Sequence, residues 1–217
     1  MKKLLPRSSL LLAVIALPTQ VKDKWELETY SRIPVNDVSF APEGIRIKVR
    51  KSASPLMYPL APQPGKISSF KISGTFQGLP EFADVRRQGE KGADDYALRL
   101  GLIVPGSRQL SGWQKLLAPA WVKNLYQKMP QGMGLDAVHF FNITQNPAQV
   151  NSVRVHPASE LIREEFIAHV SQPGPFQYEY KLKEPASAVA LWLAVDGDDT
   201  QSNYDVVISS LELRSEP

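Results

Sequence analysis

Hydrophobic and polar residues alternate along several stretches of the chain, and this alternation predicts β-strands. In residues 45–49 every second residue is Ile or Val, and the residues between them are charged. Residues 70–76 and 176–182 follow the same pattern. Because successive side chains of a strand point to opposite faces, each of these strands is expected to have one face on water.

Two other stretches, 96–104 and 188–195, are apolar on much of both faces, which predicts central strands that are covered from both sides. Further strands are predicted at 25–30, 137–143, 153–155, 161–170 and 206–213. Turn-forming Gly, Pro, Asp and Asn residues separate them. About ten short strands without a βαβ rhythm predict a mostly β fold, an antiparallel β-sandwich or jelly roll.

Residues 110–128 break the alternation. Trp113, Leu116 and Trp121 recur there at spacings that fit helical turns better than a strand. Pro119 lies within the stretch and is expected to kink or split a helix. We therefore predict one or two short helices inserted between strands.

The formal charge of the chain is +3, from 25 basic and 22 acidic residues. Lys2, Lys3 and Arg7 lie in the first twenty residues, which hold no acid, so residues 21–217 have no net charge. A balanced domain gives no reason to expect a nucleic-acid partner, which usually requires a basic face. The chain has no cysteine, which excludes disulfides, thiolate metal sites and a cysteine nucleophile.

Residues 1–20 have the pattern of a secretory signal peptide, with a basic start followed by the apolar run 10–17. This run is too short for a transmembrane span, which needs about 20 residues. We therefore expect a periplasmic or secreted bacterial protein with one β-sandwich domain over residues 24–217. The alternative is that the segment forms a buried N-terminal strand or helix of the fold.

The loop that follows the second central strand is acidic and contains a glycine turn. Asp196, Asp198 and Asp199 lie in this loop and Asp205 follows, so oxygen ligands for Ca²⁺ are at hand. The alternative is a plain solvated turn, because Asp and Gly are favoured in turns for backbone reasons. The sequence thus offers Ca²⁺ as a possible metal and no other cofactor.

Aromatic residues in the helical insert are the second candidate. Trp113, Trp121 and Tyr126 would stack on sugar rings if they are exposed. The alternative is that they dock the insert onto the sheets, which suits their large apolar area.

Catalytic patterns are scarce. His139, His156 and His169 stand alone without zinc-site spacing, and His139 is expected to be half-buried in a strand. Two adjacent acid pairs, 94–95 and 164–165, suggest glycosidic chemistry, but neighbours in a strand point to opposite faces. No catalytic residue is assigned.

Three segments resemble a bacterial family known as domain of unknown function 3047. Residues 52–56 (SASPL) resemble its SASGL-type element, 91–100 its GDD-aromatic strand, and 190–200 its apolar strand with an acidic loop. Pro55 stands where that family usually has glycine. The resemblance spans roughly 24–214 and implies an exported, galactose-binding-like jelly roll with no established activity.

If the matched loops share one end of the sandwich, their charged residues are expected to form a cluster that needs a cation or polar ligand. The expected members are Asp94, Asp95, Arg99, Asp196, Asp198 and Asp199.

Taken together, these observations favour a non-catalytic domain that binds a glycan or another envelope polymer. The alternatives are a carboxylate-dependent polysaccharide hydrolase or lyase and a structural partner in cell-envelope assembly.

Overall fold

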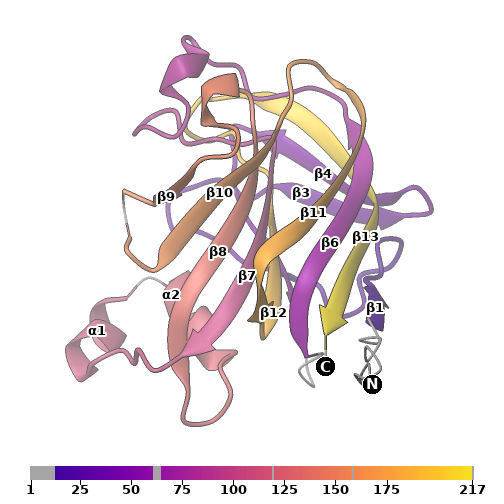
Figure 1. Cartoon of the computed structure of the whole chain (residues 1–217). Helices are drawn as coiled ribbons and strands as arrows, with labels where there is room; N and C mark the ends of the chain where they lie inside the picture. Colours follow the sequence, from indigo (N-terminus) through magenta and orange to yellow (C-terminus); the bar gives the residue numbers. More distant parts are fainter. Residues whose placement is uncertain (1–12, 61–64, 119, 158, 217) are drawn as a thin grey trace, which may run out of the picture.

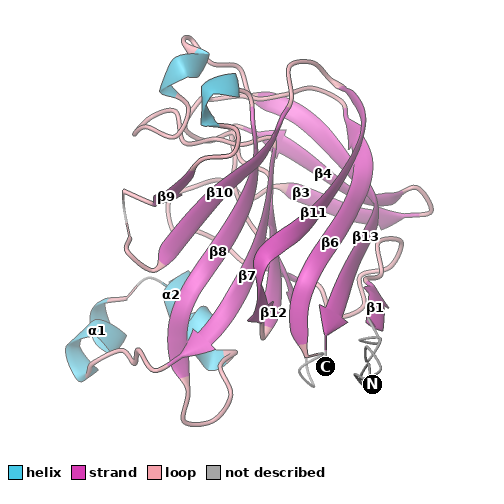
Figure 2. Cartoon of the chain, in the orientation of Figure 1, coloured by secondary structure: helices cyan, strands magenta, loops and turns pink. Residues whose placement is uncertain are grey.

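The computed structural model describes residues 13–60, 65–118, 120–157 and 159–216. Figures 1 and 2 show twisted β-sheets stacked face to face, with the helices α1 and α2 beside one end of the sandwich. The predicted mostly β sandwich with a short helical insert is therefore confirmed.

Sheet A follows the strand order β11-β6-β13-β4-β3, and β1 also pairs with β13. Its strands are β1 (Ala13–Ala16), β3 (Asp37–Ala41), β4 (Gly44–Arg50), β6 (Lys66–Phe76), β11 (Gly174–Ser187) and β13 (Asn203–Glu216). All of its pairs are antiparallel. The alternating stretches 45–49, 70–76 and 176–182 all lie in this sheet, whose outer face is wet as predicted.

Sheet B follows the order β2-β5-β12-β7-β8-β10-β9. Its strands are β2 (Glu26–Leu27), β5 (Leu56–Pro59), β7 (Leu98–Gly106), β8 (Gly134–Thr144), β9 (Val153–Val155), β10 (Ile162–His169) and β12 (Ala190–Ala194). The two predicted central strands are β7 and β12, which pair with each other in the middle of the sheet. The prediction of an antiparallel sandwich misses one pair, because β10 runs parallel to β8. The chain leaves β8, runs back through β9, and places β10 between them.

One apolar core fills the space between the sheets. Leu191 and Leu193 of β12 and Leu98 and Leu100 of β7 point into it, where they meet Ile72 of sheet A and its neighbours. A second apolar cluster covers part of the outer face of sheet B. Sheet B is thus buried on both faces over part of its area, which explains its continuous apolar strands.

The helical insert contributes to this outer apolar cluster. It consists of α1 (Gly112–Leu117) and α2 (Ala120–Gln127), and residue 119 lies outside the described residues. Leu125 of α2 packs in the outer cluster with Trp192, and Asn124 donates a hydrogen bond of 2.7 Å to Glu28. The insert therefore forms one wall over the outer face of sheet B.

Residues 1–12 of the predicted leader lie outside the described residues. Ala13–Ala16 form β1, which pairs with the end of β13. Leu17 is buried, and Thr19 donates a hydrogen bond of 2.9 Å to the Ser209 carbonyl. Residues 13–16 are therefore a strand of sheet A, although three of the four are exposed and not buried as the alternative interpretation expected. No helix among the described residues is long and apolar enough to cross a membrane.

Candidate functional site

A pocket of about 380 Å³ opens on the outer face of sheet B, next to the helical insert. It exists because β12 and β7 send alternate side chains outward. Leu191 and Leu193 enter the core, whereas Trp192 and Ala194 face the pocket. The pocket is lined by Tyr30, Ile33, Ala53, Asp94, Asp95, Arg99, Trp121, Val138, Phe140, His156, Ile162, Trp192, Ala194, Asp196, Asp198 and Asp199.

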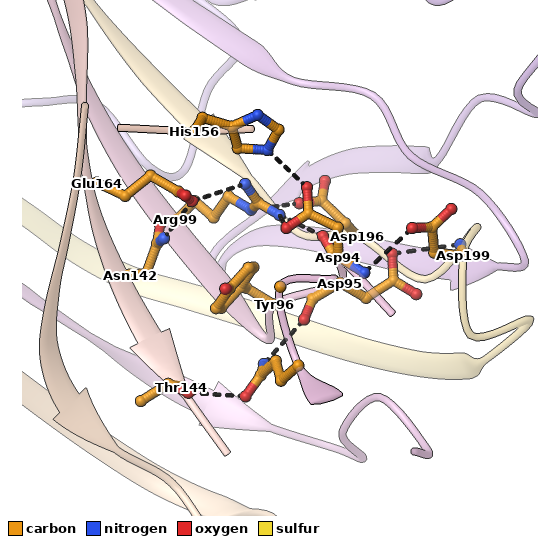
Figure 3. A network of polar contacts seen from close by, with 12 residues as sticks. Asp94, Asp95, Tyr96, Arg99, Asn142, Thr144, His156, Glu164, Asp196 and Asp199 are labelled. Carbon is orange, nitrogen blue, oxygen red and sulfur yellow. Dashed lines mark hydrogen bonds and ion pairs between the residues drawn. The ribbon is translucent and has the colours of Figure 1, made fainter. Parts of the chain in front are cut away.

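Arg99 lies at the base of this pocket and is almost completely buried. Its guanidinium contacts three carboxylates: Asp196 at 2.9 Å, Asp94 at 3.4 Å and Glu164 at 3.4 Å (Figure 3). It also stacks over the Tyr96 ring, with 4.2 Å between the guanidinium carbon and the ring centroid. Such a charge stays buried only because partners surround it, so Arg99 organises the polar part of the site.

Asp94 is held by basic side chains on several sides. Its Oδ2 lies 2.8 Å from Nε2 of His156, and its Oδ1 lies 3.5 Å from Arg154. Burial opposes ionisation, but the His156 hydrogen bond and the charges of Arg99 and Arg154 hold the pKa of Asp94 below its ordinary value. Asp94 therefore remains a carboxylate.

Glu164 completes this ion-pair network from β10. Its side chain is fully buried, accepts a hydrogen bond of 2.6 Å from Arg154 and another of 2.8 Å from Asn142. The next residue, Glu165, points to the opposite face and pairs with Tyr180 and Lys183. The adjacent acids thus do not form a working pair, as the strand geometry predicts.

Asp95 and Asp199 tie the two acidic loops together. Asp95 accepts hydrogen bonds from the backbone of Asp199 at 3.3 Å and of Thr200 at 2.6 Å. In return, Asp199 accepts hydrogen bonds of 3.1 Å from the backbone of Gly92 and of Asp94 (Figure 3). These reciprocal bonds fix the loops against each other, so both carboxylates act mainly to shape the pocket.

Two carboxyl groups of the pocket have strongly raised pKa values. Burial, together with repulsion from Asp95 and Asp198, raises the pKa of Asp196 to about 7, although Arg99 opposes this. Burial and the negative charges of Asp95 and Asp199 raise the pKa of Asp198 to about 6. One buried arginine cannot neutralise every nearby acid, so this part of the pocket keeps an excess of negative charge.

Aromatic rings also line the pocket. Trp121 of α2 contacts Tyr30 edge-on with ring centroids 6.2 Å apart, and contacts Trp192 in the same way at 6.0 Å. Phe140 lies against Trp192, again edge-on, with centroids 5.5 Å apart. The lining of the pocket therefore offers both apolar ring surface and carboxylates.

The structure brings together most of the residues singled out from the sequence. The two acidic segments and Arg99 form one cluster. Arg99 contacts both Asp94 and Asp196, and Asp199 accepts a hydrogen bond from the Asp94 backbone. Of the three aromatic residues proposed from the sequence, Trp113, Trp121 and Tyr126, only Trp121 lines the pocket. Trp113 is 78% exposed on α1, and Tyr126 packs beside the outer apolar cluster, where burial raises its pKa.

Asp205 does not lie with the other residues of the predicted calcium set. It extends from β13 in sheet A and pairs with Arg50 at 2.7 Å. Of that set, only Asp196, Asp198 and Asp199 line the pocket.

A different trio has the geometry of a metal site. Ligand atoms of Asp94, His156 and Glu164 lie within 4.8 Å of one another. Their charges are already compensated, however, because Arg99 and Arg154 each contact both carboxylates. A cation at this position would have to displace an arginine, so the trio fits an internal ion-pair network better than a metal centre.

Sequence reasoning did not assign Tyr30, Asn142, Arg154, His156 or Glu164 to the site. Contacts such as those between His156 and Asp94 join residues 62 positions apart, and no spacing motif marks them. One signal was present: strand geometry indicates that only one of the two glutamates at 164–165 can face each side of sheet B.

A second, larger groove of about 940 Å³ lies on the other side of β8 and β10, against β11. His139 lines it half-buried, as predicted, with its ring 4.6 Å from that of Phe141 and its Nε2 3.8 Å from Glu165. Lys183 also pairs with Glu165, at 2.5 Å. Because these polar groups pair with one another, the groove offers a ligand fewer unsatisfied partners than the first pocket does.

No family model matches the chain, and neither does any curated protein. Among solved structures, the chain is similar to a xylan-binding module CBM15, with 11% identity, a TM-score of 0.38, and coverage of 94% of this chain and 99% of that chain. It is also similar to a Crh5 transglycosylase in complex with NAG, with 7% identity, a TM-score of 0.42, and coverage of 93% and 83%.

A third similar structure is the VIP36 exoplasmic/lumenal domain in its Ca²⁺/Man2-bound form. The identity is 10%, the TM-score is 0.38, and the alignment covers 91% of this chain and 86% of that chain. All three TM-scores and identities are low, so none of the ligands or activities in these names is assigned to this chain.

Proposed function

We propose that this protein is a glycan-binding domain and that its ligand site is the pocket on the outer face of sheet B. The observation that carries the proposal is the presence of both aromatic rings and carboxylates in the lining of one pocket. A sugar ring has the same two-sided chemistry, because its C–H face packs on aromatic rings while its hydroxyl groups donate to carboxylates. The volume of about 380 Å³ lies within the usual range for small-molecule sites.

The polar network supports this role because it holds the site rigid before a ligand arrives. Arg99, Asp95 and Asp199 fix strand ends and loops through contacts within the protein. A site fixed in this way loses little entropy on binding. Export to the periplasm or the cell surface, where an envelope glycan would be met, remains a prediction from the basic and apolar start of the chain.

Two tryptophans of the insert provide a matched test. Trp121 lines the pocket, whereas Trp113 projects from α1 and is 78% exposed. We expect Trp121→Ala to weaken binding of the best oligosaccharide in a panel by roughly 30-fold, the size of an aromatic hot spot of about 2 kcal/mol. Trp113→Ala should bind as the unmodified protein does.

Isothermal titration calorimetry measures both variants, and circular dichroism confirms that each is folded. Equal loss of affinity in the two variants, or loss only in Trp113→Ala, would show that the ligand binds outside the pocket.

A second candidate function is hydrolysis of a glycosidic bond. Asp94 and Asp196 face the same pocket, and their pKa values are shifted in opposite directions, which is how acid and nucleophile are arranged in many glycosidases. Release of reducing ends from a bound oligosaccharide, abolished in Asp196→Asn, would establish this activity. Binding without any release would leave the pocket as a binding site alone.

A further inference from the structure

One acid of the pocket described above has no partner side chain among the residues that the structure describes. Among the described residues, the Asp198 carboxylate has no cationic side chain in contact and no hydrogen-bond donor apart from its own backbone N–H. The other acids of the pocket are all engaged, either with Arg99 or with backbone N–H groups of the opposite loop. Asp198 is half-buried and lines the pocket, so it is available to a ligand.

A second unsatisfied group lies in the lining of the same pocket. Trp192 is only 3% exposed, lines the same pocket, and its Nε1–H has no acceptor among the described residues. A buried indole N–H usually has a hydrogen-bond partner, because leaving it unpaired costs free energy. The pocket thus lacks one acceptor near Trp192 and one donor near Asp198.

The charge balance of the lining residues indicates the sign of the missing donor. Five aspartates line the pocket, against Arg99 and His156 as the only basic residues among its described lining. An anionic ligand would meet repulsion there, whereas a cationic group would offset the excess charge. Trp121 and Tyr30 add ring surface beside it, and such rings attract an ammonium group.

A metal ion fits these groups less well than an ammonium group does. Ca²⁺ requires six to eight oxygen ligands. Of the pocket carboxylates, only that of Asp198 is uncommitted, because Asp95 and Asp199 bind backbone N–H groups and Asp94 and Asp196 contact Arg99. One carboxylate with aromatic neighbours is sufficient for an ammonium group.

We propose that the glycan of this pocket contains a sugar with a free amino group, whose ammonium binds Asp198 while a neighbouring hydroxyl oxygen accepts from Trp192. This inference rests on the proposed glycan-binding function and names its substrate class. It predicts that the protein distinguishes an amino sugar from the same sugar in acetylated or neutral form.

Isothermal titration calorimetry with the full chain tests the inference using three matched tetrasaccharides: β-1,4-linked glucosamine, N-acetylglucosamine and glucose. We expect the glucosamine oligomer to bind roughly 10- to 100-fold more tightly, as a hydrogen bond to a charged group implies. Asp198→Asn should remove this preference. The matched control Asp37→Asn, which removes an exposed carboxylate of sheet A, should retain it.

Each outcome is decisive. Equal binding of the three oligomers, or an undiminished preference in Asp198→Asn, overturns the amino-sugar inference and leaves glycan binding in place. No binding of these oligomers or of a wider neutral panel overturns the proposed function together with the inference. A thermal shift with Ca²⁺ that is reversed by EDTA and lost in Asp198→Asn would show that the cation is a metal, which also overturns the inference.

Discussion

The two sheets differ in how deeply the ion pairs on their outer faces are buried. On sheet A, Lys48 pairs with Asp37 and Arg214 pairs with Glu179, and all four side chains are at least 40% exposed. On sheet B, the Arg99 side chain is 8% exposed and that of Glu164 is fully buried. Exposed pairs contribute little to stability, whereas buried charges impose a desolvation cost. A fold that needs only a wet sheet face has no reason to bury charges, so sheet B is where function is expected.

The largest effect should come from removing the central charge of sheet B. Arg99→Met leaves Asp94, Asp196 and Glu164 without their shared partner, so we expect a loss of about 3–5 kcal/mol in the free energy of unfolding. Lys48→Met on sheet A, the matched control, should cost about 0–1 kcal/mol. Urea denaturation measures both. Similar losses of unfolding free energy in the two variants would show that the buried ion pairs of Arg99 contribute no more to stability than the exposed pair of Lys48 does.

A smaller effect is expected from Asp198, and it should depend on pH. Its pKa is raised from 3.8 to about 6, so the folded state retains the proton at pH values where the unfolded state has lost it. This contribution to stability is complete below about pH 4 and is lost as the pH rises through about 6.

Asp198→Asn is neutral at every pH and should therefore gain stability over the unmodified protein as the pH rises from about 4 to about 7. A two-unit shift corresponds to about 3 kcal/mol, and we expect roughly 1 kcal/mol because the group is half-exposed and screened. Thermal melts at several pH values measure the difference. A constant difference, or a gain at low pH, would exclude the raised pKa. A variant that is more stable yet binds less well is typical of a binding site.

The smallest effect belongs to Asp205. Its partner Arg50 has a side chain that is 53% exposed on sheet A. Asp205→Asn should change the free energy of unfolding by less than about 1 kcal/mol and leave oligosaccharide binding unchanged. Calorimetry and denaturation together check this. A loss of ligand or calcium binding in this variant would show that Asp205 belongs to the binding site.

The contrast between the faces also explains how much the sequence could predict. Apolar and polar residues alternate in the strands of sheet A because one face is on water. The pattern alone therefore predicts the strands at 45–49, 70–76 and 176–182. The central strands 96–104 and 188–195 were recognised by their two apolar faces. Arg99 falls among apolar residues, where a charge indicates either a functional site or a buried partner.

Other features of the structure could not be predicted from local sequence patterns. The parallel pairing of β10 with β8 depends on how the chain returns through β9, and short apolar runs do not specify it. Tyr30 and His156 reach the pocket, and Arg154 reaches the ion-pair network beside it, from segments whose position is set by tertiary packing. The different roles of the acids could not be predicted either, because Asp95 and Asp199 fix the loops through backbone hydrogen bonds that a motif does not encode.

A crystal structure of the chain with its tightest-binding oligosaccharide would test whether the ligand binds on the outer face of sheet B. We expect a sugar ring against Trp121 with a polar group at Asp198. A sugar bound instead in the larger groove beside His139 and Lys183, with the pocket holding no part of it, would contradict the account.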